Sequence, residues 1–266
     1  MNNIILEEYE MFKKFCLYTL LACLVVSKTY AGFTIFPMAV DFEENSRKRS
    51  QTLNIMNSSN ELQTYRVNLV QYKQNEQGKF EEVESMPNSA KDFLVFSPKQ
   101  FTLKPGKTQA IRVARKGLGN MADGESVTHL VVREVEMPRV KKATEEGEED
   151  TLSVSVKVLQ AIGIPVTILK GKDLYAKTEV ESAKIKDGKV EVVLNRLGNI
   201  SSRVKLIVKD EKGTEIGRTD NVRIYLPNTK RTVSVSLKKD VTTKPTTLVL
   251  EDGLTGKEIL QTSISK

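Results

Sequence analysis

Residues 151–160 read TLSVSVKVLQ, and polar and apolar side chains alternate through most of this stretch. A period of two is typical of a β-strand with one dry face and one wet face. The dry face carries Leu152, Val154, Val156 and Val158. Such a face either completes the core of its own domain or enters a partner protein that lacks a strand.

The same alternation recurs along the chain from Phe33 onward, for example in residues 65–69 and 111–113. Turn sequences such as Pro105-Gly106 separate the apolar runs, at intervals of about ten residues. No amphipathic pattern in this part of the sequence is long enough for a helix of three turns. The pattern predicts an all-β fold built of immunoglobulin-like sandwiches.

The series of strands is interrupted once. Lys170-Gly171-Lys172-Asp173 ends the first series and leads into a second. We therefore expect one domain over residues 32–168, with about seven strands, and another over residues 174–266, with a similar number. Residues 138–150 are basic in their first half and acidic in their second, and they lack apolar periodicity. This composition is typical of a mobile loop between strands.

The N-terminal residues have the features of a secretory signal peptide. The pair Lys13-Lys14 precedes an apolar run over residues 15–26, and Thr29-Tyr30-Ala31 ends on a small residue, as a signal-peptidase cleavage site does. The run is shorter than the roughly 20 apolar residues of a membrane-spanning helix, so stable membrane insertion is not expected. We predict that residues 1–31 are the signal peptide region, with Met11 as the true start and cleavage after Ala31.

The cysteine and histidine content excludes several classes of site. Cys16 and Cys23 both lie in the predicted leader, where Leu20-Leu21-Ala22-Cys23 offers the alternative of a lipidated N-terminus. The sole histidine, His129, is not grouped with a serine and an acid in a catalytic motif. The acidic run of residues 145–150 lacks the turn residues of a calcium loop. The sequence therefore predicts no enzyme activity, no metal site and no cofactor.

The charge balance invites a comparison with nucleic-acid-binding proteins. The chain has 41 Lys and Arg against 34 Asp and Glu, which gives a net charge of +7. It has no Trp and only 6% aromatic residues, and no basic run is interleaved with rings. Single-strand binding needs such rings for stacking, and duplex binding needs a clustered basic surface. We therefore expect no nucleic-acid partner.

Several stretches together resemble one protein family. FTLKPGKTQAIRVARKG at 101–117 and SVTHLVVREVEMP at 126–138 precede the alternating strand, which closes on Pro165. NRLGN at 195–199 and YLPNTKR at 225–231 are matching turns in the second series of strands. The sequence resembles the periplasmic pilus chaperones of the chaperone-usher pathway, specifically the archaic class that includes the Csu pilus chaperone.

The resemblance implies a boomerang of two immunoglobulin-like domains in the periplasm. Its partners would be pilus subunits, bound one to one, and the outer-membrane usher that receives them. The final strand of the first domain, residues 151–162, would lie in the groove of a subunit that lacks its last strand. The donor side chains would be Leu152, Val154, Val156 and Val158. The alternative is a secreted structural or adhesive β-sandwich protein of the cell surface, which would need no such partner.

The resemblance also implies a site for the terminal carboxylate of the subunit. Better-known family members hold it with an arginine on the first strand and a lysine on the last. Here residues 32–40 contain no basic residue, and Gln160 stands five positions before Pro165. A carboxylate in a dry groove still needs charged hydrogen bonds, for which the forked guanidinium of arginine is well suited. The candidates, each of which could equally be a solvated cation, are Arg112, Arg115, Lys157 and His129.

Overall fold

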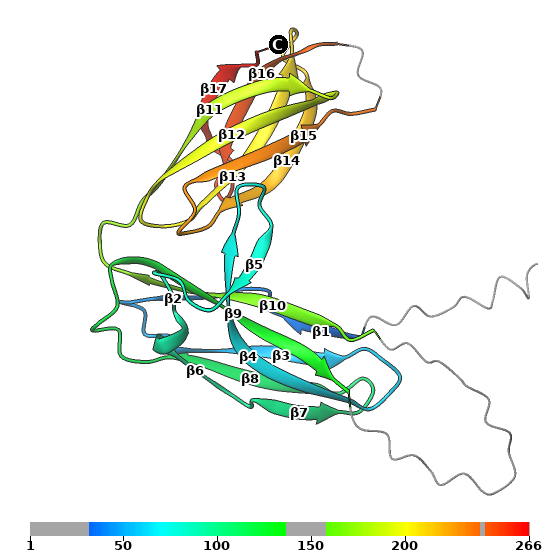
Figure 1. Ribbon diagram of the computed structural model, residues 1–266, viewed down its shortest axis with the longest axis vertical. Helices are drawn as coiled ribbons and strands as arrows, with labels where there is room; N and C mark the ends of the chain where they lie inside the picture. Colours follow the sequence, from blue (N-terminus) through cyan, green and yellow to red (C-terminus); the bar gives the residue numbers. More distant parts are fainter. Residues whose placement is uncertain (1–31, 137–157, 240–242, 266) are drawn as a thin grey trace, which may run out of the picture.

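The computed structural model of the chain describes residues 32–136, 158–239 and 243–265 (Figure 1). Several predicted features lie outside the described residues: the signal peptide region 1–31, the loop 138–150, Leu152, Val154, Val156 and Lys157. The described secondary structure consists of strands and one short 3-10 helix, η1 (Lys91–Phe93). The all-β prediction is therefore confirmed.

The first ten strands form a sandwich of two sheets. Their bounds are β1 (Phe33–Phe36), β2 (Val40–Glu43), β3 (Ser50–Asn57), β4 (Gln63–Gln74), β5 (Phe80–Val83), β6 (Leu94–Ser97), β7 (Gln100–Leu103), β8 (Thr108–Arg115), β9 (Gly124–Val135) and β10 (Ala161–Lys170). One sheet has the order β1-β3-β8-β6, and the other has the order β2-β10-β9-β4-β5, with β7 also paired to β4.

The predicted first strand, residues 32–40, is split between the two sheets. Its first part, β1, pairs antiparallel with β3, whereas β2 pairs parallel with β10. Pro37 lies between them and has no amide hydrogen with which to continue a ladder. The chain crosses from one sheet to the other at this point. Such divisions explain why the domain has more strands than the sequence predicted.

Apolar side chains from both sheets fill the core of the first sandwich. Alternate residues of β10, namely Ile164, Val166 and Ile168, are fully buried in it. Leu53 and Ile55 of β3 reach the same core from the opposite sheet. The period-two pattern therefore has the physical origin expected of it, because one face of each strand meets the other sheet.

Seven further strands form a second sandwich with its own core. Their bounds are β11 (Ala176–Lys186), β12 (Lys189–Gly198), β13 (Ser202–Asp210), β14 (Glu215–Ile224), β15 (Lys230–Ser236), β16 (Pro245–Asp252) and β17 (Glu258–Ser263). The sheets have the orders β11-β12-β15 and β14-β13-β16-β17. Two cores between four sheets confirm the prediction of two immunoglobulin-like β-sandwiches.

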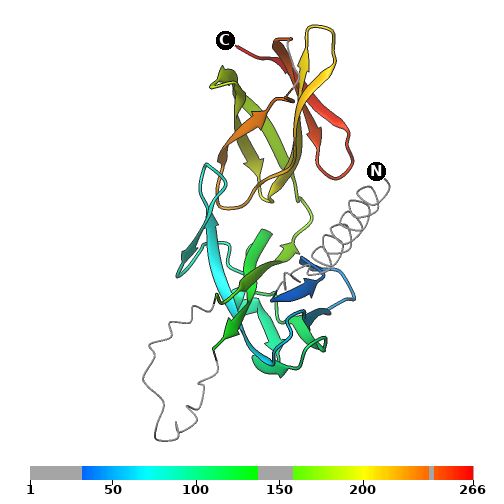
Figure 2. The same cartoon turned by 90° about the vertical axis from the view of Figure 1, so that its right-hand side faces the viewer.

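The two sandwiches lie end to end, and two segments that connect them can be followed in Figures 1 and 2. One is the linker between Lys170, where β10 ends, and Ala176, where β11 begins. The other is the hairpin formed by β4 and β5, which projects from the first domain toward the second. Within the described residues, no helix has the length and apolar character needed to cross a membrane.

Candidate functional site

The first domain presents a strand, β10, with one fully paired edge and one partly paired edge. It pairs with β9 along its whole length, from Ala161 to Lys170. On the other edge, β2 covers only Val166–Leu169. Within the described part of the chain, no strand pairs with Ala161–Pro165 on that side. This bare length of backbone can accept a strand from another chain.

The apolar face of β10 continues beyond the end of the strand. Ile164, Val166 and Ile168 are buried on one face of the strand, and Ile162 packs at the margin of the core. Val158 has the same parity, is separated from Ile162 by the exposed polar residue Gln160, and is itself 78% exposed. It is the one predicted donor residue that the structure describes. Its side chain has the exposure expected of a group that a partner would cover.

Gln160 is tightly held at the point where β10 begins. Its amide donates to Glu134 Oε2 at 3.1 Å, and its carbonyl accepts the Glu134 amide at 2.9 Å. Its side-chain Oε1 accepts the amide of Gly32 at 3.1 Å. These residues line a hollow of about 280 Å³ together with Val158. The exposed apolar segment therefore leads directly into a well-anchored strand.

Two predicted carboxylate ligands lie on β8, in the sheet opposite β10. Arg112 is exposed and donates to Ser50 Oγ at 3.0 Å. Arg115 is half-buried, and its Nη2 donates to the carbonyl oxygens of Glu44 at 2.8 Å and Ser46 at 3.0 Å. Arg115 therefore stabilises the loop that follows β2, whereas Arg112 remains largely available to solvent.

A third predicted ligand, His129, is buried on β9 and is surrounded by rings. Its imidazole meets Tyr72 edge-on at 5.1 Å and Phe80 at 5.7 Å between centroids. Burial lowers the pKa of His129 to about 4, so the residue is neutral at pH 7. The structure does not bring His129 together with Arg112 and Arg115, because they lie in different sheets. Their role as carboxylate ligands stays a prediction.

A hollow of about 260 Å³ lies between the domains and is lined by arginine side chains that the sequence did not predict as site residues. Asp41 and Thr167 line it from the first domain, and Arg203 and Arg223 line it from the second. Arg223 Nη1 also donates to the hydroxyl of Tyr225 at 3.1 Å. Alternation along a strand gave no signal for these arginines, because it does not indicate which surfaces of two domains meet.

The tip of the β4–β5 hairpin binds the second domain next to this hollow. The amide of Tyr225 donates to Gln74 Oε1 at 3.1 Å, and the amide of Thr232 donates to the carbonyl of Glu76 at 2.7 Å. The main chain of the second domain thus contacts the hairpin at two positions. The hairpin limits how far the cleft can open, since both bonds must break before the domains separate.

A buried carboxylate makes a further connection across the domain boundary. Glu125, at the start of β9, accepts the amide of Ser201 at 2.8 Å and also the hydroxyl of the same residue. The amide of Glu125 donates to the carbonyl of Asn199 at 2.9 Å. A charged acceptor with donors of this kind is well suited to hold two domains in one orientation.

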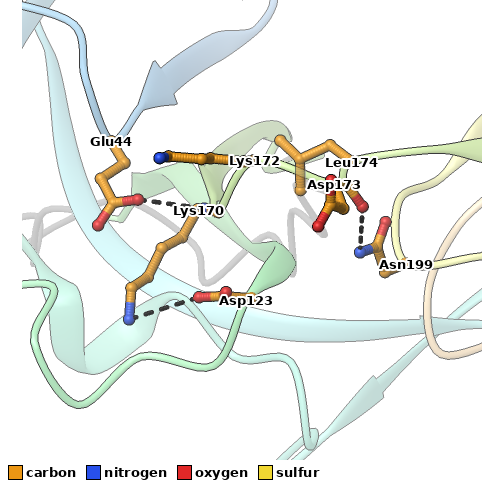
Figure 3. Close-up of a pocket in the computed structure, with 8 residues that line it drawn as sticks. Glu44, Asp123, Lys170, Lys172, Asp173, Leu174 and Asn199 are labelled. Carbon is orange, nitrogen blue, oxygen red and sulfur yellow. Dashed lines mark hydrogen bonds and ion pairs between the residues drawn. The ribbon is translucent and has the colours of Figure 1, made fainter.

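Figure 3 shows a third hollow, of about 470 Å³, along the linker. On the first-domain side Lys170 Nζ pairs with Asp123 at 3.7 Å, and on the second-domain side Asn199 Nδ2 donates to the carbonyl of Asp173 at 2.9 Å. Across the described ranges there is no group of three residues that could hold a metal ion. The hollow is part of the connection between the domains.

Comparison with known families identifies the first sandwich. Residues 32–163 match the family described as "Pili and flagellar-assembly chaperone, PapD N-terminal domain". Over these residues the first domain is similar to this chaperone domain. The matched part of the chaperone domain extends from β1 into the bare edge of β10. Among the curated proteins, none matches the chain.

Solved chaperone structures share the fold over most of the chain. A chaperone–tip adhesin complex of CFA/I fimbriae biogenesis is 16% identical, with a TM-score of 0.52 and coverage of 88% of this chain and 99% of that chain. The chaperone of the CsuC–CsuE pre-assembly complex, from the archaic Csu pili of Acinetobacter baumannii, is 16% identical, with a TM-score of 0.50 and coverage of 89% and 99%. The YadV chaperone is 12% identical, with a TM-score of 0.50 and coverage of 88% and 100%.

Proposed function

We propose that this chain is a periplasmic chaperone that binds pilus subunits and stabilises them by donor-strand complementation. The bare edge of β10 at Ala161–Pro165, which continues into exposed Val158, is the observation that carries this function. A subunit that lacks its last strand exposes an apolar groove and bare edges of its own. The two surfaces complement each other, and the family of the first domain supports the same function.

The donor side chains in this proposal are Leu152, Val154, Val156 and Val158. Each aliphatic side chain contributes roughly 1.5–3 kcal/mol when a partner buries it fully, so four would contribute about 6–12 kcal/mol before ordering costs. Backbone bonds along the edge of β10 would supply register. An interaction of this size can hold a subunit and still be displaced by a complete strand from the next subunit.

We infer further that the chain passes its subunits to the outer-membrane usher and belongs to the archaic class, together with the Csu pilus chaperone CsuC. The stretches at residues 101–117 and 126–138, which resemble this class, support the proposal. The predicted leader that ends at Ala31 supports export to the periplasm. Strand donation involves no bond chemistry, so the proposed function needs no catalytic group, metal or nucleotide.

The subunit's terminal carboxylate would need a cationic site at the end of the groove. Arg112 and Arg115 remain candidates from the sequence. The interdomain hollow adds Arg203 and Arg223, which face β10 across the cleft near Thr167. We propose Arg223 as the strongest of these cleft candidates, because its stacking over the Tyr225 ring, 5.7 Å from the centroid, orients its guanidinium.

The function is tested by co-expressing the chain with candidate subunits encoded beside its gene and isolating complexes from the periplasm. The expected product is a one-to-one complex with a small β-rich protein, identified by native mass. Val158→Asp should abolish the complex, because a charge in a dry groove costs several kcal/mol. Val158 is exposed in the free chain, so this substitution should leave folding unchanged.

Val95→Asp is the matched control, since Val95 is 49% exposed on edge strand β6, away from β10. It should preserve the complex. Equal losses in both variants would contradict the assignment of the binding edge. Recovery of the chain alone, or in polymers on the cell surface, would favour the structural or adhesive alternative.

A further inference from the structure

Gly32 occupies a position that the predicted processing of the chain would change chemically. It directly follows Ala31, after which the leader is expected to be cleaved. Hydrolysis of the Ala31–Gly32 bond leaves a carboxylate on Ala31 and a free α-amino group on Gly32. In the structure, the Gly32 nitrogen donates to Gln160 Oε1 at 3.1 Å.

A buried carboxylate lies beside this nitrogen. Glu134 is only 6% exposed, and within the described residues it makes no ion pair. A Cβ on Gly32 would overlap with Glu134 Oε1. Since a Cβ lies two bonds from the amide nitrogen, this oxygen is within about 5 Å of the Gly32 nitrogen.

An unpaired carboxylate is costly to bury, because desolvation disfavours its charged form. Among the described residues, the amide of Gln160 donates to Oε2 of the Glu134 carboxylate. Its charge also raises the pKa of the buried Tyr65 hydroxyl, after the larger effect of burial itself. A cation placed at the Gly32 nitrogen would compensate the charge of Glu134 directly.

We propose that Glu134 and Gln160 form a binding site for the α-ammonium group of the mature chain, which cleavage after Ala31 creates at Gly32. An α-amino group has an ordinary pKa of about 7.7–8.0, and a neighbouring carboxylate raises it, so the group is cationic at pH 7. The site rests on the proposed export of the chain, because an uncleaved chain has an uncharged amide at this position.

The site links processing to the subunit-binding segment. The same carboxylate that would hold the α-ammonium binds the backbone of Gln160, two residues after the exposed donor Val158. An ammonium at Gly32 would lie beside Glu134 Oε1 and Gln160 Oε1, and so would stabilise the side chains of both residues. Removal of the leader therefore completes the anchor from which the donor segment extends.

The test compares a chain that begins at Gly32 with a chain that begins at Ala31, both released from a cleavable fusion. Acetic anhydride labelling measures the reactivity of the α-amino group as a function of pH. In the chain that begins at Gly32, we expect labelling at pH 7 to be at least tenfold slower than in Glu134→Gln. Glu136→Gln, which removes an exposed carboxylate two residues away, should not change the rate.

Urea unfolding provides a second measurement that does not depend on labelling. Retaining Ala31 should lower the folding equilibrium constant about tenfold in the native sequence and leave it unchanged in the Glu134→Gln background. Labelling rates that are equal in the native sequence and Glu134→Gln, or a retained Ala31 that has no effect, would overturn the ammonium site. An intact mass of the exported chain that places the cleavage elsewhere would also overturn it.

These measurements use the free chain, so they separate the ammonium site from the proposed function. A protected Gly32 amine in a chain that fails to bind any subunit would support the site and reject the chaperone function. An unprotected amine in a chain that still forms a one-to-one subunit complex would reject the ammonium site and support the chaperone function.

Discussion

The ring of Phe80, on β5 of the first domain, meets the ring of Tyr225 in the second domain edge-on, with 5.4 Å between the centroids. Phe80 also contacts His129 on β9. Its ring therefore connects β9 of the first domain to Tyr225 of the second domain. The neighbouring bond from the Tyr225 amide to Gln74 Oε1 fixes the same contact from the main chain. The hairpin therefore contributes to the orientation of the two domains, together with the bonds of Glu125 to Ser201 and Asn199.

Replacement of Phe80 by Ala should loosen this contact. An aromatic pair contributes about 0.5–1.5 kcal/mol beyond its buried area, so we expect a loss of about 1 kcal/mol in the free energy of unfolding and a wider range of domain orientations. Urea unfolding and small-angle X-ray scattering measure the two effects. Phe36→Ala is the control, because Phe36 is 73% exposed and lies on β1. Equal effects of the two variants would mean that the hairpin ring does not hold the domains.

Glu125→Ala should destabilise the domain boundary more strongly. The substitution removes a charged acceptor from the amide and hydroxyl of Ser201, and hydrogen bonds to charged groups contribute about 1.5–3 kcal/mol. Ser201→Ala should cost less, since its amide still donates to Glu125. Urea unfolding of both variants and of the double variant gives their coupling. Additive losses would contradict a direct interaction, and exposed Glu211→Ala should have no measurable effect.

Stability should fall on acidification partly through His129. Burial lowers its pKa in the folded chain from 6.5 to about 4, so the unfolded chain takes up the proton first as the pH drops. The contribution of neutral His129 to the free energy of unfolding is complete above about pH 6.5 and decreases by roughly 2 kcal/mol by pH 4.5. Urea unfolding of the native sequence and of His129→Gln at pH 7.5 and 4.5 measures this share. The variant should lose less stability between the two pH values, and identical losses would exclude His129 as the cause.

The predicted parity of the donor segment can be tested with neighbouring residues. Val156→Asp should abolish binding of the subunit, because Val156 is predicted to enter the dry groove. Ser155→Asp introduces the same charge on the predicted wet face and should preserve binding. Co-purification of the subunit from periplasmic extracts measures both. Loss of binding in Ser155→Asp alone would reverse the assignment of the two faces.

The residue that holds the subunit's terminal carboxylate can be identified by comparing a full-length subunit with one that lacks its terminal residues. Arg223→Ala should weaken binding of a full-length subunit by about tenfold or more, as expected for loss of a charged hydrogen bond. It should affect a subunit without its terminal residues much less. Titration of both subunits with each variant measures the difference. If Arg112→Ala or Arg115→Ala shows the length-dependent loss instead, the anchor lies on β8.

Much of the fold follows from local patterns. Leu53 and Ile55, for example, have the spacing of a strand with one buried face, and both are fully buried. Pro37 could have indicated the division between β1 and β2, but its sequence context does not show that the two halves join different sheets. His129 was recognisable as a strand residue, whereas the ring of Phe80 that covers it comes from another strand.

The strands, their division into two series and the residues of the apolar faces could be predicted from the sequence, because side-chain alternation is a property of consecutive residues. The tertiary packing, in contrast, left Ala161–Pro165 with an edge that no described strand pairs, and it buried Glu134 beside Gly32. It also decided that Arg223 faces the cleft. These features depend on which distant segments pack together, and strand pairing and domain contact are set by the whole core rather than by neighbours in the chain.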